Sequence, residues 1–276
     1  MTNTLIILAG GASSRMKNSV DPHLSEEKSN QANHRSKGLI EIHGKPFLYY
    51  LINNASKAGF ESIYIITGED ASQFRSALSN QTDLKTLDIQ FATQYIPSER
   101  VKPYGTADAV YQCLEQYPEL KNKTFCVCNS DNLYTTQAFE LLKKAPSNQA
   151  ILAYDIDALE YPIEKISRFA VMKFNEQYDL LDIIEKPDPS VISNYTDASG
   201  KTRVSMNIFL FDGNIFFDYL KNCPPHSERN EKELPTALKN MIKDGKVVLG
   251  IPIATHVPDL TAKGDITILE QYLDQN

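Results

Sequence analysis

The chain has 276 residues, of which 42% are hydrophobic and 23% charged, a composition typical of a soluble globular protein with a sizeable core. Its formal net charge of −7 argues against nonspecific nucleic-acid binding, which requires a basic surface. A site for anionic substrates must therefore concentrate positive charge locally. The four cysteines form no CxxC pair and the five histidines are scattered, so we expect buried thiols and no zinc site.

The N-terminal apolar run, residues 5–9, is too short for the core of a signal peptide, and no basic residue precedes it. No other apolar run approaches the length of a membrane span. We therefore expect a cytoplasmic protein with no membrane partner.

The first half of the chain alternates predicted strands and helices. Continuous apolar runs predict strands buried on both faces, and periodic segments predict the helices between them. In chain order we expect strands 4–9 and 39–42, helix 46–58, strand 62–67, helix 71–79, strand 89–93, helix 106–116, strand 124–129 and helix 135–144. This order predicts a three-layer α/β fold with a mostly parallel, doubly wound sheet. The polar stretch 17–36 shows no periodicity and is expected to be a long mobile loop.

After residue 149 the pattern changes to consecutive strands. We expect strands at 150–155, 169–174, 180–185 and 204–211, arranged as an antiparallel meander added to the sheet. Helices 215–221, 233–243 and 262–273 follow, with a strand at 247–251 between the last two. Because no repeat or flexible linker interrupts the chain, we expect a single domain spanning residues 1–276.

The glycine loop that follows the first strand, residues 10–16 (GGASSRM), is the most informative segment. Glycines at this place let a ligand approach the backbone, and their N–H groups can bind phosphate oxygens. Arg15 adds a planar guanidinium suited to phosphate. The loop matches neither the Walker A nor the GxGxxG pattern. A plain strand-to-helix turn with a solvated Arg15 is the alternative interpretation.

Four elements occur in the order that is typical of one family of enzymes. They are LAGGASSRM at 8–16 with KGL at 37–39, GTADAV at 105–110, SDN at 130–132 and EKP at 185–187. Together they resemble the sugar-phosphate nucleotidylyltransferase family. The resemblance implies the nucleotide-diphospho-sugar transferase fold, which is Rossmann-type and similar to GT-A, with a nucleotide-binding half (1–149) and an acceptor-binding half (150–276).

The resemblance also implies a reaction: transfer of NMP from a nucleoside triphosphate to a sugar 1-phosphate, with release of pyrophosphate and Mg²⁺ as cofactor. Such a site must align two polyanions and neutralise their charge. Arg15 and Lys37 would contact the triphosphate as catalytic residues, and Asp131 would be both catalytic and a metal ligand. Asp259 is the second expected metal ligand, and Asp265 is a nearby competitor.

The same resemblance implies the remaining contacts. The nucleotide is expected to touch Leu8, Ala9, Gly10, Gly11, Gln94, Gly105 and Thr106. Gln94 would pair with the base, since an amide offers both a donor and an acceptor. On the acceptor side, Lys186 would hold the phosphate, and Glu185 and Asn207 would contact sugar hydroxyls.

Several alternatives stay open at this point. The acceptor could be a non-sugar phosphate such as phosphocholine, or the chain could be a non-catalytic relative that senses nucleotide sugars. A glycosyltransferase of related fold would lack the pair Arg15 and Lys37. GTADAV resembles the form found in ADP-glucose pyrophosphorylases, but it leaves the nucleobase undecided. The stretch 17–36 is expected to be either a lid over the triphosphate or an inert insertion.

Overall fold

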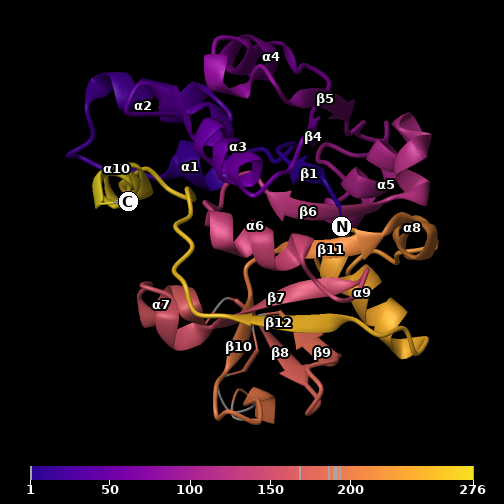
Figure 1. Ribbon diagram of the computed structural model, residues 1–276. Helices are drawn as coiled ribbons and strands as arrows, with labels where there is room; N and C mark the ends of the chain where they lie inside the picture. The colour runs from indigo at the N-terminus through magenta and orange to yellow at the C-terminus, as the bar shows by residue number, and fades with distance from the viewer. Residues whose placement is uncertain (1, 168, 186, 189–191, 193, 276) are drawn as a thin grey trace.

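The computed structural model describes residues 2–167, 169–185, 187–188, 192 and 194–275 (Figure 1). The strands are β1 (Thr4–Leu8), β2 (Glu41–Ile42), β3 (Lys45–Pro46), β4 (Ser62–Thr67), β5 (Asp88–Thr93), β6 (Thr124–Asn129), β7 (Ala150–Asp155), β8 (Ala170–Phe174), β9 (Leu180–Ile184), β10 (Arg203–Ser205), β11 (Ile208–Asp212) and β12 (Leu249–Ile253). The helices are α1 (Ser14–Asn18), α2 (Glu26–His34), α3 (Phe47–Lys57), α4 (Ser72–Ser79), α5 (Thr106–Gln116), α6 (Thr136–Lys143), α7 (Ile163–Ile166), α8 (Gly213–Lys221), α9 (Leu234–Lys243) and α10 (Gly264–Gln275). Short 3-10 turns lie at Lys37–Leu39, Thr82–Leu84, Pro118–Asn122 and Ile156–Ala158.

One mixed sheet runs through both halves, in the order β5-β4-β1-β6-β11-β7-β10-β8-β9, and β12 pairs with β7 off this path. Strands β5, β4, β1 and β6 are parallel to their neighbours in the first half. The second half adds antiparallel pairs, apart from β12, which is parallel to β7. β2 and β3 form a separate two-stranded ribbon. The expected fold class is confirmed, with the parallel strands concentrated in the first half of the chain.

Side-chain alternation along the parallel strands produces the three layers. Leu5 and Ile7 of β1 face a core that includes buried residues of α3, α4 and α6. Ile6 points the other way, into a core that includes buried residues of α5, α8 and α9. A strand that is apolar on both faces therefore lies between two helical layers.

The four cysteines are free and buried: Cys113, Cys126, Cys128 and Cys223. Cys126 and Cys128 share the core of the α3 layer, as their two-residue spacing predicts. Burial raises the pKa of the Cys113 thiol to about 12. These thiols are therefore protonated and inaccessible at neutral pH.

The stretch expected as one strand, 204–211, is divided by a bend. Asn207 has a φ of 56°, a left-handed conformation that asparagine tolerates better than most residues. The bend separates β10, which joins β8, from β11, which joins β6, although both strands also pair with β7. The expected meander is therefore wrong in detail, because β11 returns to connect the two halves of the sheet.

The stretch 17–36 is not a continuous loop as expected, because it contains helix α2. Ser25 caps α2, its hydroxyl accepting from the N–H of Lys28 at 3.4 Å. The Lys28 ammonium also forms an ion pair of 2.5 Å with Glu270 of α10. A third core joins these segments, comprising Met16, Ala32, Ile40, Ile42, Phe47, Leu133, Leu260, Ile266 and Leu269. Figure 1 shows α10 beside α1 and α2, so the C-terminal helix packs against this stretch.

Among the described residues, none of the helices has both the length and the apolar character needed to cross a membrane.

Candidate active site

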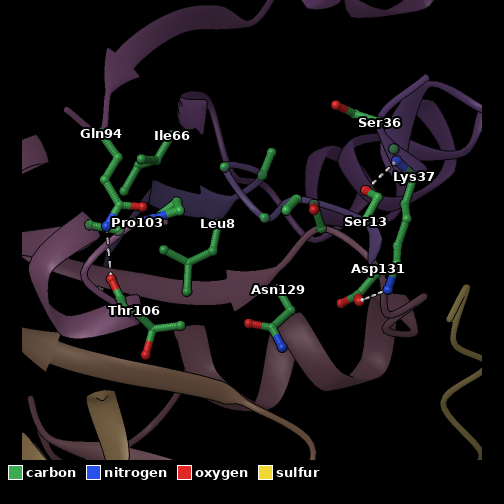
Figure 2. Close-up of a pocket in the computed structure, with 18 of the residues that line it drawn as sticks. Leu8, Ser13, Ser36, Lys37, Ile66, Gln94, Pro103, Thr106, Asn129 and Asp131 are labelled. Atoms are coloured by element: carbon green, nitrogen blue, oxygen red, sulfur yellow. Dashed lines mark hydrogen bonds and ion pairs between the residues drawn. The ribbon is translucent and has the colours of Figure 1, made fainter. Parts of the chain in front are cut away.

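A cavity of about 390 Å³ lies at the carboxyl edge of the parallel strands, where ligands bind in open α/β sheets. Its lining is drawn from the loops that follow β1, β5 and β6 and from the start of α5 (Figure 2). The lining residues are 8–14, 36–38, Ile66, Gln94, Lys102, Pro103, Gly105, Thr106, Ala109, 129–131 and Glu231. The structure thus brings together every expected nucleotide contact, with Lys37 and Asp131.

The glycine loop forms part of the lining of this cavity. A Cβ on Gly10 would lie 3.4 Å from Oε1 of Gln94 and 3.5 Å from the carbonyl carbon of Thr67, so the backbone is closely packed there. A Cβ on Gly11 would meet nothing within 4 Å. Ser13 has a φ of 55°, and its hydroxyl accepts from the N–H of Lys37 at 3.3 Å. The loop is therefore hydrogen-bonded to the segment that carries Lys37.

Lys37 and Asp131 form an ion pair across the cavity rim. The Lys37 ammonium lies 2.8 Å from Oδ2 of Asp131, and the two side chains are 11% and 26% exposed. Figure 2 shows this pair on the side of the cavity away from Gln94. Arg15, in contrast, is exposed on α1 and does not line the cavity. A charge pair thus marks one end of the cavity, whereas Arg15 would reach a triphosphate only by turning inward.

Gln94 is buried, and its amide is oriented by the protein. Its Nε2 donates to the carbonyl of Gly105 at 2.9 Å and to Oδ2 of Asp108 at 3.0 Å. The same carboxylate oxygen accepts from Gln112 at 2.8 Å. The amide oxygen of Gln94 faces Gly10, and both residues line the cavity. Sequence reasoning predicted Gln94 but missed Asp108, which lies within GTADAV and fixes the orientation of Gln94.

The segment Gly105–Thr106 is held against the chain before α9. Gly105 has a φ of 104°, and a Cβ on it would lie 2.3 Å from the carbonyl oxygen of Lys232. That oxygen accepts from the N–H of Ala107 at 2.9 Å. The Thr106 hydroxyl accepts from the N–H of Leu234 at 3.0 Å. Glycine is therefore required at position 105 by a close approach of two chain segments.

Several cavity residues lie outside the motifs, among them Lys102, Pro103 and Glu231. Lys102 and Pro103 belong to the loop between β5 and α5, and Glu231 comes from the second half of the chain. Arg100 of the same loop donates to the carbonyl of Asn230 at 2.8 Å. The loop between β5 and α5 thus meets a loop from the second half of the chain, and both contribute residues to the cavity lining.

The chain brings Asp259 next to Asp131 after β12. Asn132 and Asp259 form an antiparallel bridge. The N–H of Leu260 donates to the carbonyl of Asp131 at 2.8 Å, and the N–H of Leu133 donates to Pro258 at 2.8 Å. Figure 1 shows this segment running from β12 toward α10. The two expected metal carboxylates therefore stand on paired backbone segments, although 128 positions separate them in the sequence.

Asp259 and its competitor Asp265 have different surroundings. Asp259 is paired with the Lys165 ammonium and accepts from the Thr261 hydroxyl at 2.9 Å. Burial raises the pKa of Asp259, and Lys165 opposes that rise. Asp265 accepts the N–H groups of Thr261 and Ala262 at 2.8 and 2.6 Å, where α10 begins. Those backbone bonds give Asp265 a helix-capping role and leave Asp259 as the better candidate metal ligand.

The donor set at Asp131 and Asp259 fits Mg²⁺. This ion uses one or two protein carboxylates and completes its octahedron with water and substrate phosphates. Within the described part of the chain, no group of three or more histidine, cysteine, aspartate or glutamate side chains is arranged to hold a metal. A cation bound here would need phosphate oxygens or water as its other ligands.

The acceptor residues expected from the sequence do not converge in the same way. Glu185 is paired with Arg229, which also contacts Glu233 at 2.9 Å. Asn207 is exposed at the bend between β10 and β11, and its N–H donates to the Ser205 hydroxyl at 3.2 Å. Neither Glu185 nor Asn207 lines the cavity. The prediction for Lys186 lies outside the described residues.

Comparison with known proteins agrees with this architecture. The structure of UDP-glucose pyrophosphorylase complexed with UDP-glucose superposes with a TM-score of 0.70 at 19% sequence identity, covering 100% of both chains. The fold is therefore that of the nucleotide-diphospho-sugar transferases.

The sequence model of the nucleotidyl transferase family matches residues 4–253, and the chain belongs to this family. The family resemblance of its motifs is thereby confirmed. The bifunctional protein GlmU of Staphylococcus epidermidis is 27% identical over 248 residues, 89% of this chain and 46% of that protein. The glucose-1-phosphate adenylyltransferase of Bacillus mycoides is 24% identical over 261 residues, 92% of this chain and 63% of that protein. The chain thus spans about half to just under two thirds of these relatives.

Proposed function

We propose that this chain is a Mg²⁺-dependent sugar-1-phosphate nucleotidylyltransferase. The observation that carries the proposal is the convergence of the glycine loop, the segment Gly105–Thr106 and the pair Lys37–Asp131 on one cavity. Family membership supports the reaction class, and the names of the relatives support a sugar 1-phosphate as acceptor. A cytoplasmic location and the lack of a nucleic-acid partner stay predictions from the sequence.

The reaction is a displacement at phosphorus. An acceptor phosphate oxygen forms a bond to the α-phosphorus as the bond to the β-phosphate breaks, and pyrophosphate leaves. The acceptor oxygen is already anionic, so no activated serine or cysteine is needed. The main demand on the protein is to align and neutralise two polyanions.

The residues of the cavity fit this demand. The N–H groups of the glycine loop are available for the phosphates, and Lys37 supplies a cation that contacts them once it leaves Asp131. Asp131 and Asp259 would hold Mg²⁺, which supplies charge neutralisation at the reacting phosphates. The amide oxygen of Gln94 would accept a hydrogen bond from the base. Arg15 would bind the outer phosphates after turning inward.

A substrate matrix tests the proposal. The protein is incubated with Mg²⁺, each nucleoside triphosphate in turn, and a set of acceptors that includes several sugar 1-phosphates and phosphocholine, and pyrophosphate release is measured. We expect turnover with at least one sugar 1-phosphate and none without Mg²⁺. Turnover with phosphocholine alone would favour the non-sugar alternative. Binding of nucleotide sugars without any turnover would favour a sensing relative and overturn the proposal.

A further inference from the structure

Lys165 is a charged residue at the site that no motif of the sequence indicates. It belongs to the four-residue helix α7, between β7 and β8 in the acceptor-binding half. Its ammonium pairs with Oδ1 of Asp259 and lies 3.7 Å from Oδ1 of Asp265. The same ammonium sits 4.4 Å from the centre of the Tyr161 ring. A lysine from the acceptor side thus reaches the carboxylate expected to bind metal.

The pair is sheltered from solvent. The side chains of Lys165, Asp259 and Asp265 are 26%, 12% and 18% exposed. An ion pair that is buried to this extent is screened less by salt than one at the surface. Removing one partner leaves a partly buried charge without a counter-ion. Lys165 therefore offsets the mutual repulsion of two carboxylates in the ligand-free protein.

A second lysine stands in the same relation to the other carboxylate. Lys37 contacts Asp131 from the nucleotide side, and Lys165 contacts Asp259 from the acceptor side. The two aspartates are linked through the backbone by the bridge between Asn132 and Asp259. Each carboxylate expected to bind metal thus carries one lysine, and the two lysines come from opposite halves of the chain.

We propose that Lys165 positions Asp259 in the free protein and, when a divalent cation takes that carboxylate, delivers its ammonium to the phosphate of the acceptor. This inference rests on the proposed function for the identity of the acceptor. An ammonium and a divalent cation compete for the same carboxylate oxygen, so binding of the cation releases the lysine. Lysine suits this exchange because its charge sits on a long flexible stem.

The exchange predicts opposite effects on two measurements. In Lys165→Met, Mn²⁺ has no competitor at Asp259, so we expect it to bind about tenfold more tightly in calorimetry of the protein without nucleotide. The acceptor loses a cation, so its KM should rise about tenfold or more. Lys165→Arg should restore part of the acceptor KM. Lys201→Met is the matched control, because Lys201 pairs with Asp155 and Asp157 at 3.3 and 3.0 Å elsewhere in the same half.

A purely structural ion pair gives a different result. Its loss would lower the melting temperature and leave Mn²⁺ binding unchanged or weaker, and either result for Mn²⁺ overturns the proposal. Tighter Mn²⁺ binding with an unchanged acceptor KM overturns it as well. If the wild-type protein turns over no substrate pair, the proposed function fails, whereas the Mn²⁺ comparison still decides whether Lys165 and the cation compete.

Discussion

The two halves of the molecule build their parts of the site by different means. In the first half, residues 1–149, backbone groups of the glycine loop and the strand ends surround the cavity. In the second half, residues 150–276, long charged side chains pair with one another, as Lys165 pairs with Asp259 and Arg229 pairs with Glu185. Backbone positions are fixed by the sheet, whereas ion pairs can be exchanged for a substrate. The first half therefore relies mainly on backbone groups, with the pair Lys37–Asp131 as its exchangeable contact at the cavity, whereas the second half relies on ion pairs between side chains.

The largest expected effect is at the junction of the two halves. We expect Asp131→Asn to lower Mg²⁺-dependent turnover by about 100-fold or more, because a bound metal supplies several kcal/mol of transition-state stabilisation. The fold should survive, since asparagine has nearly the same shape. Pyrophosphate release measures the loss of turnover, and thermal melting measures whether the fold survives. Turnover at the wild-type rate would show that Asp131 is no metal ligand.

The contact between the halves is tested by Gly105→Ala. The added Cβ would collide with the backbone of Lys232 and strain a φ of 104°, which should lower the free energy of unfolding by about 3 kcal/mol. Denaturant titration measures this loss, and the KM for the triphosphate should rise with it. Gly68→Ala is the control, because a Cβ there meets nothing within 4 Å. Equal stability of the two variants would contradict the close approach.

A smaller effect is expected for Arg229→Met on the acceptor side. Glu185 is expected to contact the acceptor and is paired with Arg229, so removing the arginine should lower the KM for the acceptor about two- to fivefold, the value of a partly exposed ion pair. Steady-state kinetics with varied acceptor measure the change. The control is Lys239→Met, whose pair with Asp182 has nearly the same exposure on the cationic side, 37% against 36%. An increase in KM would mean that Arg229 itself binds the acceptor.

The smallest effect concerns the segment 17–36. We expect Lys28→Met to remove an ion pair to Glu270 worth at most about 1 kcal/mol and to leave the KM for the triphosphate unchanged, because α2 is packed against α10. Chemical denaturation and kinetics measure the two quantities. Lys17→Met, at an exposed position of the same segment, is the control. A large change in the KM would restore the lid interpretation.

The parts of the fold that could be predicted from the sequence are those with a clear pattern of apolar side chains. The bounds of β4, α5 and β6 match the expected ranges, because buried strands and amphipathic helices leave strong patterns. Strand ends then place Leu8, Gln94 and Asp131 at one edge of the sheet. The roles assigned to these residues stay predictions.

What could not be predicted depends on weak local signals or distant contacts. Helix α2 buries only Ala32, so its sequence has no apolar periodicity, and its local signals are limited to the N-cap residue Ser25 and the acidic residues Glu26 and Glu27. The bend at Asn207 falls within a stretch, 204–211, that alternates apolar and polar residues and then becomes fully apolar, so no turn signal marks it. Lys165 belongs to no motif, and its partner Asp259 is 94 positions away.

The buried thiols make the protein convenient for site-specific labelling. Because all four native cysteines are protonated and inaccessible, a cysteine introduced at Val101 would be the reactive thiol of the folded chain. Val101 is 94% exposed on the loop that supplies Lys102 and Pro103 to the cavity. A fluorophore attached there would report occupancy of the cavity in solution without prior removal of any native cysteine.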